Sequence, residues 1–274
     1  MSAQSLNVLL RALNLSAFVL HHQDAAETAQ RQGWEPLAYL HYLTELEIET
    51  RRQRKIERLA KASHLPSGKT LSTLDTTRFP QKVQRQLPAL CSGQFLERAE
   101  NILAFGPPGR GKTHLLSAVG HELVSSGRSV LFVQAHRLVQ GLLIAKRDLT
   151  MDRELRRLDR FDALIIDDIG YIQQQPQEME VLFTLLAERY ECKSVMISSN
   201  LVFSQWDKIF KDPMTTAAAI DRLVHHCTIL ELTGPSYRTD HAIKNKDNDS
   251  PQEERSRTPN STKGRSTFNN DAQI

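Results

Sequence analysis

The stretch FGPPGRGKTHLL, residues 105–116, constrains this chain more than any other part of its sequence. It matches the pattern G-x-x-x-x-G-K-[ST] and lies between an apolar run and a segment with helical spacing. Glycines let the backbone curl so that successive N–H groups point inward, and a following helix adds its positive end. The structural alternative is an ordinary glycine-rich turn, but the position favours a site that grips a triphosphate. The residues predicted to bind it are Gly106, Pro107, Pro108, Gly109, Arg110, Gly111, Lys112, Thr113 and His114.

The segment ALIIDD, residues 163–168, places two carboxylates at the end of a predicted strand. Lys112 is expected to reach the β- and γ-phosphates, while the Thr113 hydroxyl and the Asp167 carboxylate hold Mg²⁺. Asp168 comes one residue later, where many ATP-hydrolysing proteins have a glutamate that polarises the attacking water. Since aspartate is one methylene shorter, water must lie closer to it or hydrolysis is slower. Two acids after a strand could also simply open a turn.

Two further polar residues follow in the same order along the chain. Asn200 ends the run SVMISSN, which would place its amide between the γ-phosphate and the attacking water. Without the preceding motifs it would be a turn residue. Arg222 lies in AAAIDRLVHHC on a predicted helix. It belongs either to a solvated helix face or to an arginine finger that reaches a neighbouring subunit.

Alternating strands and helices fill the middle of the chain, which predicts a parallel sheet covered on both faces. Residues 1–69 are expected to form a small, basic helical domain and residues 70–238 the nucleotide-binding domain. Residues 239–274 are polar and are expected to be a disordered tail. The predicted strands are 101–105, 129–133, 163–167, 194–198 and 228–232, and the predicted helices include 113–125, 176–190 and 215–226.

Composition excludes several other classes of protein. The apolar runs are too short to cross a bilayer, and the N-terminus lacks the features of a secretory signal, so a cytoplasmic protein is expected. The 3 cysteines are far apart, which suggests neither disulfides nor a zinc site. His225 and His226 are adjacent, and adjacent positions on a helix do not face one another, so no metal site is expected there.

Two clusters of Lys and Arg are candidates for contacting DNA. Such side chains neutralise phosphates without choosing a sequence and give binding that depends steeply on salt. The alternative is two solvated helix faces, partly balanced by nearby glutamates. The candidate residues are Arg51, Arg52, Arg54 and Lys55 in the first cluster, and Lys146, Arg147, Arg153, Arg156 and Arg157 in the second.

The segments GPPGRGKTH, LIIDDIGY, ISSN and AAIDRLVHH together resemble the IstB/DnaC branch of the AAA+ ATPases, in particular the IstB-like helper ATPases of insertion-sequence transposons. The resemblance covers roughly residues 35–238. It implies an α/β AAA+ P-loop NTPase fold with ATP and Mg²⁺ as ligands. It also implies that Asp168 stands in the catalytic position, that Asn200 is the first sensor, and that Arg222 acts in trans.

The same resemblance implies the partners of the protein. They are duplex DNA, on which the chain would assemble with ATP as a homo-oligomer and which it would deform, and a cognate transposase that it would recruit or stimulate. The residues depart from the family pattern at Asp168, which replaces the more usual glutamate, and a second sensor arginine is not evident. The resemblance also favours the second basic cluster as the DNA contact. In initiator-type AAA+ proteins, which this branch resembles, helices inserted after the second strand line a central DNA channel.

Two other functions remain compatible with these motifs. A DnaC-like loader of a replicative helicase would have nearly the same ATPase core. A scaffold that uses ATP only to assemble on DNA, with little hydrolysis, is compatible with Asp168. The N-terminal segment RRQRKIERLAKASHLPSGKTL favours the transposon helper over the loader.

Overall fold

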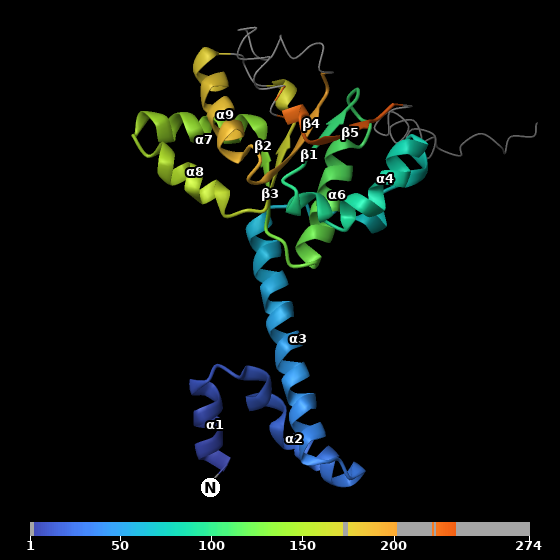
Figure 1. The fold of residues 1–274 in the computed structure, drawn as a ribbon, viewed down its shortest axis with the longest axis vertical. Helices are drawn as coiled ribbons and strands as arrows, with labels where there is room; N and C mark the ends of the chain where they lie inside the picture. Colours follow the sequence, from blue (N-terminus) through green and yellow to red (C-terminus); the bar gives the residue numbers. More distant parts are fainter. Residues whose placement is uncertain (1–2, 172–174, 202–220, 222, 234–274) are drawn as a thin grey trace, which may run out of the picture. The chain divides into compact units, whose positions relative to one another are not determined.

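A parallel sheet forms the centre of the protein (Figure 1). The computed structural model describes residues 3–171, 175–201, 221 and 223–233, and the sheet contains five strands within these ranges. They are β1 (Asn101–Phe105), β2 (Val130–Gln134), β3 (Ala163–Asp167), β4 (Ser194–Ser199) and β5 (Cys227–Glu231). Their order across the sheet is β2-β3-β4-β1-β5, so β4 lies between β3 and β1. All four neighbouring pairs are parallel.

The three central strands are buried along their whole length. Their apolar runs form strands because both faces of a parallel sheet must be covered. Asn101 is the polar exception in β1. Its Oδ1 accepts a hydrogen bond of 2.9 Å from the backbone N–H of Val195, and its Nδ2 donates to the carbonyl oxygen of Leu223 at 3.3 Å. This buried amide therefore links β1 to β4 and to the segment before β5.

Helices cover both faces of the sheet, and alternate strand residues contribute to two apolar clusters. Leu103 and Ile166 belong to the cluster that includes α7 (Ala135–Arg147) and α9 (Pro176–Arg189). Ile102 and Ile165 belong to the cluster with α4 (Gln81–Cys91) and α6 (Lys112–Ser125). The period of two in the strands therefore assigns neighbouring residues to opposite layers. Two further helices of this part are α5 (Gln94–Glu97) and α8 (Met151–Asp159).

The first helices of the described chain are α1 (Ala3–Ala12), α2 (Ser16–Gln32) and α3 (Pro36–Ser63). α2 packs along α3, and the N–H of Ala17 at the start of α2 donates a hydrogen bond of 2.7 Å to Oε2 of the buried Glu47. α3 also contacts α6 and β2. The 3₁₀ turns η1 (Leu71–Thr73) and η2 (Thr76–Arg78) follow α3, and η3 (Ile169–Tyr171) follows β3.

The predicted parallel sheet is confirmed, as are the strands 101–105 and 163–167. The strand predicted at 129–133 is wrong by one residue, because Ser129 instead bonds the Asp162 carboxylate through its N–H and its hydroxyl. β5 also begins one residue earlier than predicted. The helix predicted at 113–125 starts at Lys112, because Gly111 adopts the left-handed conformation that caps it.

Several predictions fall on residues that lie outside the described ranges, namely most of the helix 215–226, Arg222 and the tail 239–274. The described residues all belong to one compact unit, Met1–Tyr237, and the domain boundary at residue 69 stays a prediction. No helix among the described residues is long and apolar enough to cross a membrane.

Candidate nucleotide-binding site

The glycine-rich loop connects the end of β1 to the start of α6. Gly106 has a φ of +149°, and a Cβ there would overlap the carbonyl oxygen of Leu232, whose N–H donates a hydrogen bond of 2.7 Å to Phe105. Gly111 has a φ of +83° and caps α6. A side chain would be strained at either position, so the loop takes a path that only glycine adopts readily. Helix α6 then begins with its free N–H groups directed at the loop.

Lys112 is the first residue of α6 and is 8% exposed. Its Nζ donates hydrogen bonds to the carbonyl oxygens of Gly106 at 2.7 Å and Pro107 at 3.0 Å. The side chain therefore folds back over the loop that its own backbone closes. Thr113 follows in the first helical turn and is half-buried. This geometry places an ammonium group beside the loop, as phosphate binding requires.

Two aspartates lie at the carboxyl end of β3 and contact β4. Asp167 is the last residue of β3 and is 9% exposed. Its Oδ1 accepts a hydrogen bond of 2.6 Å from the Ser198 hydroxyl. Asp168 has a φ of +66°, and its N–H donates to the same Ser198 Oγ at 2.8 Å. The Ser198 hydroxyl therefore bonds the side chain of Asp167 and the backbone of Asp168.

Asn200 follows directly after β4, and its Oδ1 is buried without a hydrogen-bond partner among the described residues. A Cβ on Gly170 would overlap this oxygen, so a glycine leaves the room that it occupies. The Nε and Nη1 atoms of Arg110 in the loop are also buried without a partner. Since orphaned buried polar atoms are costly, both groups fit a site that binds a polar ligand. The Arg110 N–H groups can donate to an anion, whereas Asn200 Oδ1 can only accept a hydrogen bond, as it would from a water molecule.

The sheet order brings these residues to one edge. Gln134 pairs with Asp167 between β2 and β3, and Phe105 pairs with Ser199 between β1 and β4. The carboxyl ends of β1, β3 and β4 are therefore adjacent, and the loop, the two aspartates and Asn200 lie at or directly after these ends. This edge of a parallel sheet is where ligands usually bind. The assigned roles, including magnesium binding by Thr113 and Asp167, stay predictions.

His114, which the loop pattern included, directs its side chain elsewhere. Its Nε2 lies 3.1 Å from the Thr73 hydroxyl and 3.2 Å from the carbonyl oxygen of Thr70. Burial lowers the pKa of His114, and the hydrogen bond to Thr70 opposes this effect. The imidazole thus ties α6 to the segment around η1, which leaves the backbone N–H of His114 as its predicted phosphate contact.

The two basic clusters differ in their surroundings. In α3, Arg51 pairs with Glu47 at 2.7 Å, Arg52 with Glu49 at 3.8 Å, and Arg54 donates to the Ser16 hydroxyl at 2.6 Å. Arg51 and Arg54 therefore help to fasten α3 to the start of α2. No ion pair of Lys55 occurs within the described ranges.

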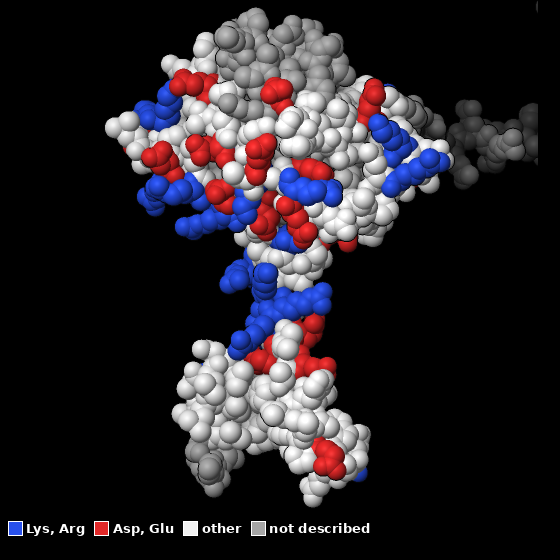
Figure 2. All heavy atoms as spheres, viewed as in Figure 1, with Lys and Arg blue, Asp and Glu red and all other residues white. Residues whose placement is uncertain are grey.

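In the second cluster, Lys146 pairs with Glu180 at 2.6 Å, and Arg147 pairs with Asp148 at 2.8 Å. Arg157 pairs with Glu154 at 2.6 Å, whereas Arg153 and Arg156 make no ion pair with any described residue. A groove of about 640 Å³ between α7 and α8 has four arginines and one acid among its lining residues, namely Arg153, Arg156, Arg157, Arg160 and Glu154. Figure 2 shows basic side chains gathered over α8 and along α3.

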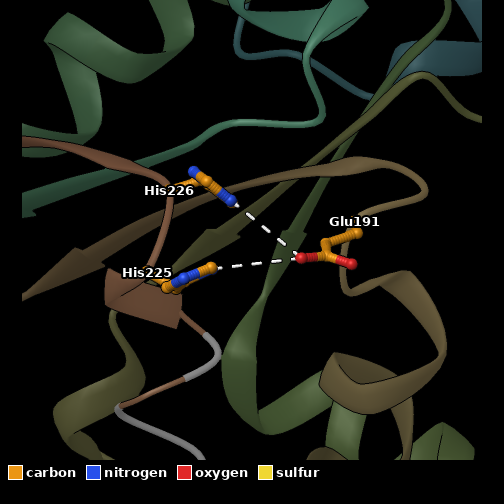
Figure 3. Close-up of side chains that lie close together, drawn as sticks. All are labelled: Glu191, His225 and His226. Atoms are coloured by element: carbon orange, nitrogen blue, oxygen red, sulfur yellow. Dashed lines mark ion pairs between the residues drawn. The ribbon is translucent and has the colours of Figure 1, made fainter.

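His225 and His226 do not behave as the sequence predicted (Figure 3). They lie in a turn before β5 rather than on a regular helix, and their ring centroids are 4.2 Å apart. Oε1 of Glu191 lies 3.9 Å from His225 Nδ1 and 4.0 Å from His226 Nε2. The expectation that these histidines would not face one another is therefore wrong, because it assumed helical geometry. All three side chains are exposed.

Sequence reasoning missed Ser198 and the contact of His114 with Thr73. Ser198 belongs to the run SVMISSN, but a serine inside an apolar strand does not reveal which strand its hydroxyl faces. Only the pairing of β4 with β3 shows that it lies beside the acids.

The chain is similar to known proteins over most of its length. The family "IstB-like ATP binding protein" matches residues 8–245. A Sinorhizobium fredii insertion sequence ATP-binding protein is 41% identical over 88% of this chain and 81% of its own length. An ATP-binding protein of insertion sequence IS21 from Pseudomonas aeruginosa is 38% identical over 85% of this chain and 88% of its own length.

Solved structures share the fold. DnaI has a TM-score of 0.53 at 22% identity over 66% of this chain and 100% of its own. AMPPCP-bound DnaA from Aquifex aeolicus has a TM-score of 0.53 at 19% identity over 70% of this chain and 59% of its own. The predicted AAA+ P-loop fold is thus confirmed. With the family matched across residues 8–245, the chain belongs to the IstB-like ATP-binding proteins.

Proposed function

We propose that this protein is an ATP-dependent, DNA-binding AAA+ regulator of transposition that hydrolyses ATP in the cytoplasm. It assembles as a homo-oligomer on duplex DNA, deforms that DNA, and recruits or stimulates the transposase of its insertion sequence. The observation that carries the proposal is the meeting of the glycine loop, Asp167, Asp168 and Asn200 at one edge of the sheet. The insertion-sequence names of its relatives support the transposition context.

Each residue at the carboxyl edge of the sheet has a separate proposed role in ATP hydrolysis. The loop N–H groups and Lys112 bind the phosphates, and the orphaned N–H groups of Arg110 fit a further contact with them. The orphaned Oδ1 of Asn200 fits a hydrogen bond from a water molecule. Thr113 and Asp167 would hold Mg²⁺, which neutralises charge on the phosphates when it is bound. Asp168 accepts a proton from the attacking water, and Asn200 orients that water. Arg222 of a neighbouring subunit is assigned to the transferred phosphate.

DNA binding is assigned to the groove between α7 and α8. Arg153, Arg156 and Arg157 are exposed there, and two of them have no acidic partner among the described residues, so their charge is available to phosphates. The α3 cluster is ranked second, because Arg51 pairs with the buried Glu47 and Arg54 donates to Ser16, so both side chains also have a structural role. Such contacts give affinity without base readout.

Electron microscopy of the purified protein with duplex DNA tests the proposal, with ATP, ADP or no nucleotide. Ordered assemblies that enclose or bend DNA are expected only with ATP. Calorimetry of the same protein should detect binding of ATP in the presence of Mg²⁺. Assemblies that ignore the nucleotide, or an absence of ATP binding, would overturn the proposal. A DnaC-like loader would instead require a replicative helicase, so addition of a helicase ring separates the two functions.

A further inference from the structure

Ser198 lies in the middle of the sheet, at the point where three strands end. It belongs to β4 and is 1% exposed. On one side it pairs with Ala104 of β1, two residues before the glycine loop begins at Gly106. On the other side its hydroxyl contacts both acids at the end of β3, Asp167 and Asp168.

The direction of these hydrogen bonds follows from the atoms involved. The N–H of Asp168 can only donate, so Ser198 Oγ accepts that bond of 2.8 Å through a lone pair. A serine hydroxyl has one hydrogen, and the bond of 2.6 Å to Asp167 directs it at Oδ1. The carboxylate is thereby held in one rotamer. Oδ2 is the oxygen that this bond leaves for another partner.

The second hydrogen bond fixes an uncommon backbone conformation. Asp168 has a φ of +66°, which is uncommon for residues other than glycine, although Asp and Asn adopt it more often than most. The bond from its N–H to Ser198 restrains this conformation. The direction in which the Asp168 side chain leaves the backbone therefore depends on the same hydroxyl as the rotamer of Asp167.

We propose that Ser198 is a positioning residue that orients Asp167 toward Mg²⁺ and Asp168 toward water. The inference rests on the proposed function, because it assumes that a magnesium nucleotide occupies this edge of the sheet. Partners of this kind commonly change metal affinity or activity by roughly 10–100-fold when they are removed. The predicted effect is therefore on the Mg²⁺ requirement, with the phosphate contacts of the loop intact.

The test compares Ser198→Ala, Ser198→Cys and Ser198→Thr with the control Ser194→Ala. Ser194 lies in the same strand and is 0% exposed, but its hydroxyl has no hydrogen-bond partner among the described residues. Calorimetry measures ATP binding by each full-length protein in EDTA and across a Mg²⁺ titration. Steady-state hydrolysis is measured over the same titration. Ser198→Cys keeps the side-chain size and is used if the alanine variant does not fold.

In EDTA, all variants should bind ATP as the wild type does. Ser198→Ala and Ser198→Cys should need on the order of tenfold more Mg²⁺ for tight binding, whereas Ser198→Thr and Ser194→Ala should match the wild type. A wild-type Mg²⁺ requirement in Ser198→Ala, or in Ser198→Cys where that variant stands in, would overturn the inference alone. If the wild-type protein binds no ATP, the proposed function fails instead.

Discussion

The Nζ atom of Lys112 donates a hydrogen bond of 2.7 Å to the carbonyl oxygen of Gly106, across the loop that both residues delimit. Gly106 in turn lies so close to Leu232 that no side chain fits between them. The lysine is therefore fixed to a backbone that the segment after β5 holds in place. Chemistry at the loop depends on a contact far along the chain as well as on the eight-residue pattern.

Replacing Lys112 by Ala should weaken ATP binding on the order of 100-fold, because charge-assisted bonds to phosphate are lost. Assembly on duplex DNA with ATP should disappear as well. Calorimetry and electron microscopy measure the two effects. Lys82→Ala in α4 removes an exposed lysine and is the matched control. Unchanged assembly of the Lys112 variant would contradict the role assigned to the loop.

Replacing Asp168 by Asn should leave ATP binding intact and reduce turnover by roughly 100-fold or more, because the base that accepts the proton is removed. Asparagine adopts the left-handed conformation readily, so the backbone at φ +66° should survive the change. Phosphate release measured at saturating ATP and DNA gives the rate. Normal release by the variant would remove the catalytic role from Asp168.

Replacing Arg222 by Ala should spare nucleotide binding and lower cooperative hydrolysis, as expected of a group that acts on a neighbouring subunit. Mixtures with the Lys112→Ala protein offer a direct test. Some mixed interfaces combine an intact loop with an intact arginine, so the mixture should recover activity that neither variant has alone. Failure of that recovery across mixing ratios would count against action in trans.

Replacing Arg153, Arg156 and Arg157 together by Ala should weaken DNA binding and reduce the slope of log affinity against log salt by up to about 3. The control is the triple variant Lys82→Ala, Arg85→Ala and Arg98→Ala. These three residues are also exposed, and their substitution removes the same number of positive charges from α4 and the end of α5. Equal slopes in both variants would mean that the α8 arginines only face solvent.

Stability should depend on pH through His114. Burial lowers its pKa from the ordinary value of 6.5, so the unfolded chain gains a proton at higher pH than the folded chain does. The free energy of unfolding should therefore be unaffected by this group above about pH 6.5 and fall as the pH decreases below it. Urea denaturation between pH 5 and pH 8 measures the slope. In His114→Gln the acid loss should be smaller, and an identical slope would refute the assignment.

The sequence allowed the strands and the loop to be predicted because their signals are local. Apolar runs such as NILAF and the spacing of Gly106, Gly109 and Gly111 occupy a few neighbouring residues. The contact of Ser198 with Asp167 joins two strands, so no local pattern contains it. His225 and His226 lie in a turn where the sequence predicts the end of a helix. The His226 carbonyl oxygen accepts a hydrogen bond of 2.8 Å from the N–H of Asn101, and this long-range contact is not contained in any local pattern either.

The place of β1 within the sheet has a consequence for biogenesis. Ile102 pairs with Met196 of β4, and Asn101 pairs with Cys227 of β5. β1 leads into the glycine loop, and it can pair with both of these strands only after most of the chain has been synthesised. Long-range pairings of this kind are formed slowly, after a costly loop closure. A ribosome-bound fragment that stops before Cys227 would leave one edge of β1 unpaired, and another chain could pair with that edge. The nucleotide-binding loop is therefore expected to reach its final conformation late in synthesis.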